Sequence, residues 1–91
     1  MTIDHDTPAH RFTVRTPDGT GELVYAETGD RTLDLRHTFV EPALRGTGAA
    51  DALVRAALAY AHEHGYRVTV SCPYVRDWLQ RHPDERDALS T

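Results

Sequence analysis

Three stretches in the first half of the chain alternate apolar and polar residues, which is the pattern of half-buried β-strands. They span residues 10–16, 22–27 and 32–40. The turn-forming sequences Pro-Asp-Gly at 17–19 and Thr-Gly-Asp at 28–30 separate them. The pattern therefore predicts three consecutive strands joined by tight turns, and strands joined in this way pair antiparallel.

The third of these strands carries candidate chemistry, so the direction of its side chains matters. Strict alternation over 32–40 places one set of side chains on a single face: Leu33, Leu35, His37 and Phe39. The set expected on the other face is Asp34, Arg36 and Thr38. We therefore expect His37 to lie on the same face as the two leucines.

The second half of the chain changes to helical spacing. Apolar positions recur every three or four residues over 46–64, and Gly65 suits the residue that ends such a helix. A strand is expected at 66–72, followed by a second helix that begins at Pro73 and ends before Pro83. The order β-β-β-α-β-α predicts an α/β sandwich in which helices pack on a mixed, mostly antiparallel sheet.

Length and composition fit one globular domain. The chain has 91 residues, of which 40% are hydrophobic and 26% charged, and we expect a single domain over 10–91 preceded by a flexible arm at 1–9. It lacks the run of about eighteen apolar residues that a membrane span needs, and its polar, acidic start is not expected to act as a signal peptide. A lone cysteine favours a cytoplasmic protein, and the net charge of −4 argues against nucleic-acid binding.

The stretch Arg45-Gly46-Thr47-Gly48 lies between a strand and the long helix. Free amides and the positive end of the helix dipole make such a position an anion site, and glycines let a phosphate approach the backbone. The stretch thus predicts a phosphate or pyrophosphate ligand, with a plain glycine-rich helix cap as the alternative. The chain has no lysine, which excludes a P-loop, and Asp51 stands where a dinucleotide fingerprint needs its third glycine.

Two side chains are candidates for covalent or acid–base chemistry. His37 titrates near neutral pH and is a candidate general base, the alternative being a half-buried strand histidine with a satisfied ring nitrogen. Cys72 precedes Pro73 at the expected start of a helix, where the dipole favours a thiolate nucleophile. The alternative for Cys72 is a small buried apolar residue. The histidines show no metal-binding spacing, so no metal site is expected.

Three motifs together resemble the short subfamily of GCN5-related N-acetyltransferases (GNAT). They are a His-Thr-Phe-Val strand end at 37–40, an Arg-Gly-Thr-Gly-Ala-Ala loop at 45–50 and a Cys-Pro-Tyr step at 72–74. The closing Arg-His-Pro-Asp-Glu at 81–85 agrees with them. The resemblance covers about residues 10–90 and implies a minimal GNAT-like fold.

The resemblance also implies an activity, the transfer of an acetyl group from acetyl-CoA to an amine whose identity is unknown. Cys72 and His37 would be the catalytic residues, either as an acyl-cysteine pair or as two groups that line the acetyl pocket. Coenzyme A would be held by Val40, Arg45, Gly46, Thr47, Gly48, Ala49 and Tyr74.

Two departures from the family pattern keep a second function open. Phe39 stands at a position that often carries a carboxylate in relatives, so an acidic base is missing there. The chain also ends before the last two strands of longer acetyltransferases, which help to build their acceptor groove. The alternative function is a non-catalytic module that binds or senses acyl-CoA. An incomplete sheet edge would also allow a homodimer.

Overall fold

The structure is a computed structural model that describes residues 2–85. Its strands are β1 (Thr2–Asp6), β2 (Arg11–Thr16), β3 (Gly19–Glu27), β4 (Thr32–Val40) and β5 (Arg67–Val70). Its helices are α1 (Ala49–Glu63), α2 (Pro73–Arg81) and the short 3-10 turn η1 (Pro42–Leu44).

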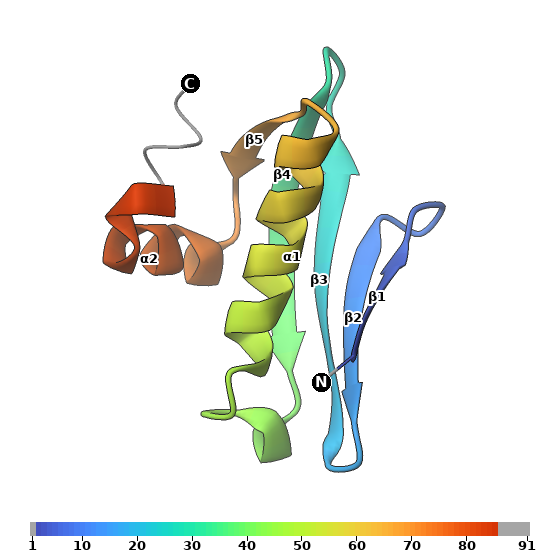
Figure 1. Cartoon of the computed structure of the whole chain (residues 1–91), viewed down its shortest axis with the longest axis vertical. Coiled ribbons are helices and arrows are strands. Elements are labelled where there is room, and N and C mark those ends of the chain that lie inside the picture. The colour runs from blue at the N-terminus through green and yellow to red at the C-terminus, as the bar shows by residue number, and fades with distance from the viewer. Residues whose placement is uncertain (1, 86–91) are drawn as a thin grey trace.

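The strands form one sheet in their chain order, β1-β2-β3-β4-β5. The first four pair antiparallel, and β5 pairs parallel to β4. Helix α1 supplies the long connection that a parallel pair requires. It lies across one face of the sheet, and α2 lies beside the edge formed by β4 and β5 (Figure 1). The mixed, mostly antiparallel sheet expected from the sequence is confirmed.

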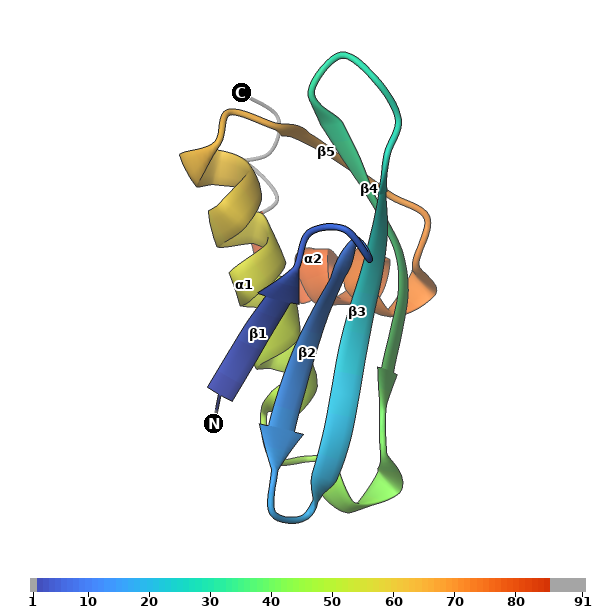
Figure 2. The same cartoon turned by 90° about the vertical axis from the view of Figure 1, so that its right-hand side faces the viewer.

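The core lies between the sheet and α1. Alternate side chains of the strands enter it, and Val14, Leu23 and Leu33 are fully buried there. Helix α1 contributes an apolar stripe: Ala49, Leu53, Val54, Ala57, Leu58 and Ala61. No helix formed by residues 2–85 covers the opposite face of the sheet (Figure 2), so the sheet has an inner face toward α1 and an outer face.

The N-terminus differs from the flexible arm expected at 1–9. Thr2–Asp6 forms β1, which pairs antiparallel with β2, so the order of elements gains a strand. The ring of His5 stacks on Phe12 at 4.0 Å, and its Nε2 lies 2.7 Å from the hydroxyl of Tyr25. These contacts attach β1 to the sheet. Because the strand offers little apolar surface, the hydrophobic pattern gave no sign of it.

A bulge in β4 corrects the expected direction of its side chains. The register runs from Tyr25 opposite Leu35 to Val24 opposite His37, which leaves Arg36 without a partner in β3. One extra residue reverses the alternation. The prediction that His37 and Phe39 share a face with Leu33 and Leu35 is therefore wrong.

Candidate functional site

The candidate site begins at the N-terminus of α1. The helix was expected from residue 46 but starts at Ala49, because Gly46 and Gly48 have left-handed φ values of +82° and +89°. Gly48 is the N-cap, and no side-chain hydrogen bond caps the helix. The amides of the first turn have no partner within the helix, and they lie at the positive end of its dipole. This start of α1 is suited to an anion.

The two glycines leave open space in front of the helix. A Cβ added to Gly46 or Gly48 would meet no atom within 4 Å. The left-handed backbone conformation therefore explains why glycine stands at these two positions. Crowding does not explain it, because no neighbouring atom would touch an added Cβ. A ligand can approach these amides without meeting a side chain.

A hollow of about 480 Å³ lies in front of this helix start, and we call it the α1 hollow. It is bounded by the end of β4, the loop that leads into α1, the first turn of α1 and the second residue of α2. Its lining residues are Thr38, Phe39, Val40, Leu44, Arg45, Gly46, Gly48, Ala49, Ala50, Asp51 and Tyr74. Six of the seven residues expected to bind coenzyme A are among them.

The remaining expected residue, Thr47, points elsewhere. Its hydroxyl donates to the carbonyl of Leu44, and its side chain lines a separate hollow beside Arg15 and Asp18. Arg45 lines the α1 hollow, and its Nε donates to the carbonyl oxygen of Val40 at 3.4 Å. This bond turns the arginine side chain back toward the end of β4.

Cys72 is buried next to this hollow. Its side chain is 3% exposed and belongs to the core, and its Sγ lies 3.6 Å from Oγ1 of Thr38. Thr38 pairs with the buried Leu23, so it faces the same side of the sheet as α1, and it lines the hollow. Cys72 therefore does not line the hollow itself but contacts a residue that does.

His37 is not brought together with Cys72. It is opposite Val24 on the outer face, it is exposed, and it does not line the α1 hollow. The bulge at Arg36 is the physical reason, because it moved Thr38 to the inner face in place of His37. The expected pair of His37 and Cys72 is therefore replaced by a contact between Thr38 and Cys72.

Asp51 lines the hollow and was not among the residues expected to bind coenzyme A. Its carboxylate accepts hydrogen bonds from Nε1 of Trp78 at 2.8 Å and Nε of Arg55 at 2.9 Å. Burial alone would raise the pKa of Asp51, but these two hydrogen bonds together with the charges of Arg55 and His82 outweigh it, and the pKa is lowered. Asp51 is therefore a carboxylate that links α1 to α2 at the edge of the hollow. In the sequence, only Trp78 could have indicated this role of Asp51, because a buried indole N–H needs a hydrogen-bond acceptor.

Among residues 2–85, no three His, Cys, Asp or Glu side chains are grouped so that they could hold a metal ion. No helix of the described chain combines the length and the apolar character that a membrane crossing requires.

The fold and the hollow together define a class of protein. It is an α/β sandwich in which a crossover helix between two parallel strands begins at a glycine loop suited to an anion. The chain belongs to the GCN5-related N-acetyltransferase family, whose model matches residues 11–88. The expected family is thus confirmed.

Relatives and a solved structure agree with this assignment. The chain is similar to the protein NATD1 of Bos taurus, with 37% identity over 84 residues, 89% of this chain and 74% of the relative. NATD1 of Homo sapiens is 34% identical over the same shares of the two chains. A GCN5-like protein from Staphylococcus aureus, solved by NMR, has the same fold, with a TM-score of 0.75 at 20% identity over 94% of this chain and 84% of that one.

Proposed function

We propose that the protein binds acetyl-CoA in the α1 hollow and transfers the acetyl group to an amine. The observation that carries this proposal is the meeting of two features in one hollow. A glycine-lined helix start suited to phosphates forms one part of its wall, and Thr38, whose hydroxyl contacts Cys72, forms another. A thioester with a pyrophosphate at a distance from its reactive group matches that arrangement.

The phosphate end of the ligand would lie at the loop. The first-turn amides of α1 would donate to the pyrophosphate, and Arg45 would add a positive charge at the mouth of the hollow. Tyr74 and Val40 line the walls between this end and Thr38. They would contact the apolar part of the ligand.

The acyl end would lie at Thr38. Because the hydroxyl of Thr38 accepts from the thiol of Cys72, its own proton is free to donate to the acyl carbonyl oxygen. In the transfer, a neutral amine nitrogen forms a bond to the carbonyl carbon and the carbon–sulfur bond breaks. The electron pair leaves on the sulfur of coenzyme A, and the proton lost by the nitrogen neutralises that thiolate.

A specific observation also supports the second function, a non-catalytic acyl-CoA binding module. His37, the expected general base, lies on the outer face and outside the hollow. A chain that holds the donor without a base at its acyl end would bind acetyl-CoA and release it unchanged. Turnover separates this function from the first.

Mass spectrometry and calorimetry of the purified protein with acetyl-CoA test the proposal. We expect binding to the wild type and amide formation with a panel of amines. Cys72→Ala should keep the binding and lose most of the turnover, whereas Cys72→Ser should retain part of it through its hydroxyl. An acetyl group on Cys72 would indicate a covalent route, and its absence during turnover would indicate direct transfer.

Binding without amide formation would support the module. Absence of acetyl-CoA binding would contradict both functions.

A further inference from the structure

On β4 the α1 hollow is lined by residues from both faces of the sheet. Two of them, Thr38 and Val40, face α1, whereas Phe39 belongs to the outer face and also lines the hollow. This is possible because β5 ends at Val70 and pairs with β4 only as far as Leu35. Beyond that point the edge of β4 has no neighbouring strand among residues 2–85, so both faces of the sheet meet the hollow.

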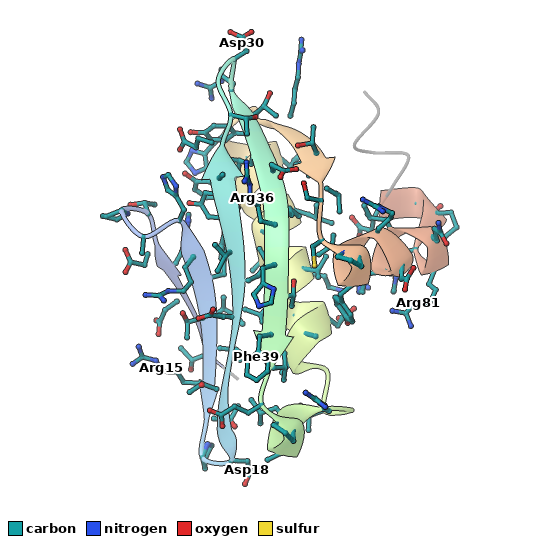
Figure 3. The ribbon with its side chains drawn as sticks, turned by 180° about the vertical axis from the view of Figure 1, so that it is seen from behind. Arg15, Asp18, Asp30, Arg36, Phe39 and Arg81 are labelled. Atoms are coloured by element: carbon teal, nitrogen blue, oxygen red, sulfur yellow. The ribbon has the colours of Figure 1, made fainter. Side chains whose placement is uncertain are left out.

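Phe39 is exposed to an unusual degree for its size. It is 46% exposed and is the sole large hydrophobic side chain recorded as exposed in the part of the chain that the structure describes. Figure 3 views the sheet from behind and shows Phe39 and Arg36 on β4, on the side with no helix over it. An exposed aromatic ring at the mouth of a hollow is a contact surface for whatever approaches from that side.

The surroundings of Phe39 on the outer face are acidic. The strand register aligns it in one row with Glu22, Thr13 and Asp4, which contains two carboxylates and no basic side chain. Glu41 follows along the chain and accepts a hydrogen bond from Thr20, the next outer-face residue of β3. Carboxylates beside an aromatic ring attract an ammonium group, and the ring face attracts it as well.

Two arginines lie in the rows on either side of this one. Arg11 lies in the adjacent row and forms an ion pair with Glu22 at 3.7 Å. That pair is exposed, so salt and solvent weaken it and the carboxylate remains accessible. Arg15 lies in the other adjacent row, opposite Thr20. The patch around Phe39 therefore presents an apolar centre with a net negative rim.

We propose that the acetyl acceptor docks on this outer-face patch, and that it is a small primary amine carrying an aromatic or other compact apolar group. The ring of Phe39 would stack on the apolar group of the amine. Glu22 would attract the protonated amine, and the ammonium group would then lose its proton to solvent. The neutral nitrogen would then reach the acyl end of the donor over the free edge of β4. This inference rests on the proposed function, because it assumes that acetyl-CoA occupies the α1 hollow.

The test compares two amines that share a nitrogen and differ in the apolar group, 2-phenylethylamine and ethylamine. We expect the wild type to acetylate 2-phenylethylamine with a kcat/KM about tenfold higher than for ethylamine, since ring stacking and burial are worth about 1.4 kcal/mol. Phe39→Ala should abolish this preference, and Phe39→Tyr should restore it. Glu22→Gln should lower kcat/KM for both amines, with a smaller dependence on salt than the wild type shows.

Tyr66→Ala is the matched control, because it also removes an aromatic ring but lies outside the α1 hollow. It should leave the preference between the amines unchanged. Faster acetylation of spermidine than of 2-phenylethylamine, or an unchanged preference in Phe39→Ala, would overturn the docking proposal.

Calorimetry with acetyl-CoA separates this inference from the proposed function. If acetyl-CoA binds wild type and Phe39→Ala equally, and NMR shows no effect of 2-phenylethylamine on the resonances of Phe39 and Glu22, the acceptor proposal fails while donor binding stands. If acetyl-CoA does not bind at all, the proposed function fails.

Discussion

Arg36 is the residue that decides which side chains of β4 reach the α1 hollow. It has no partner in β3, so Thr38 turns toward α1 and His37 turns away. The contact between Thr38 and Cys72 depends on this single insertion. The bulge at Arg36 therefore decides which side chain of β4 lies beside Cys72. The types of the residues alone would have favoured His37 for that position.

Gly48 allows a prediction with a closely matched control. An alanine there would take a left-handed φ of +89° and place its Cβ in the open space of the hollow. We expect Gly48→Ala to lose about 1 kcal/mol of stability and about tenfold in acetyl-CoA affinity. Gly29→Ala meets the same backbone condition, with a φ of +92° and no atom within 4 Å.

Gly29 lies in the turn between β3 and β4, away from the hollow. Its alanine variant should lose similar stability in urea denaturation and keep its affinity for acetyl-CoA in calorimetry. Equal affinities of the Gly48 and Gly29 variants would contradict a ligand at the start of α1.

At the scale of elements, β1 is held to the sheet by an aromatic contact. The ring of His5 lies between Phe12 and Tyr60 and meets the hydroxyl of Tyr25. Burial raises the pKa of Tyr25 to about 12, so this hydroxyl keeps its proton. A neutral imidazole fits this position, and a charged one would lose solvation there.

The stability of the protein is therefore expected to depend on His5 at mildly acidic pH. Burial lowers the pKa of His5 from its ordinary 6.5; the Asp6 carboxylate opposes this shift, and His64 and His10 add to it. Below 6.5 the unfolded chain binds this proton more readily than the folded one, so stability falls until the pH passes the folded pKa.

Thermal denaturation as a function of pH checks this expectation. His5→Phe keeps the stack on Phe12 and should flatten the fall in melting temperature below pH 6.5. His62→Gln, at an exposed position of α1, should retain the slope of the wild type. A slope that His5→Phe leaves unchanged would show that another group controls it.

At the scale of the whole molecule, α1 and α2 are joined by a polar contact over the edge of the sheet. Nε1 of Trp78 donates to Asp51, and Arg55 contacts Asp51 and lies over the indole ring at 5.2 Å. Asp51 lines the α1 hollow, and α2 carries Tyr74 on another part of its wall. The contact therefore fixes two walls of the hollow relative to each other.

A double-mutant cycle measures this contact. Trp78→Phe removes the indole N–H together with some packing, and Asp51→Ala removes the acceptor. Because the cycle cancels the packing loss, we expect a coupling of about 1 kcal/mol between the two changes in urea denaturation. Asp51→Asn keeps an acceptor for the indole and should cost less than Asp51→Ala. Additive effects of the two substitutions would mean that the hydrogen bond contributes nothing.

The features that depend on a local pattern of residues could be predicted from the amino-acid sequence. Periodicity predicted four of the strands and both helices, and the Arg-Gly-Thr-Gly stretch predicted the loop before α1, three of whose residues line the hollow. These features follow from spacing along the chain and from the conformations that glycine permits. The family assignment rested on the same local motifs.

The features that depend on contacts between residues distant in the sequence could not be predicted from it. Strand β1 is held to the sheet by the contacts of His5 with Phe12 and Tyr25. The alternation of polar and apolar residues within this short polar segment gives no sign of these contacts. The bulge at Arg36 depends on the register against β3, which local alternation does not specify. For that reason the sequence could name Cys72 but did not indicate which residue of β4 it contacts, and the contact with Thr38 became visible only in the folded chain.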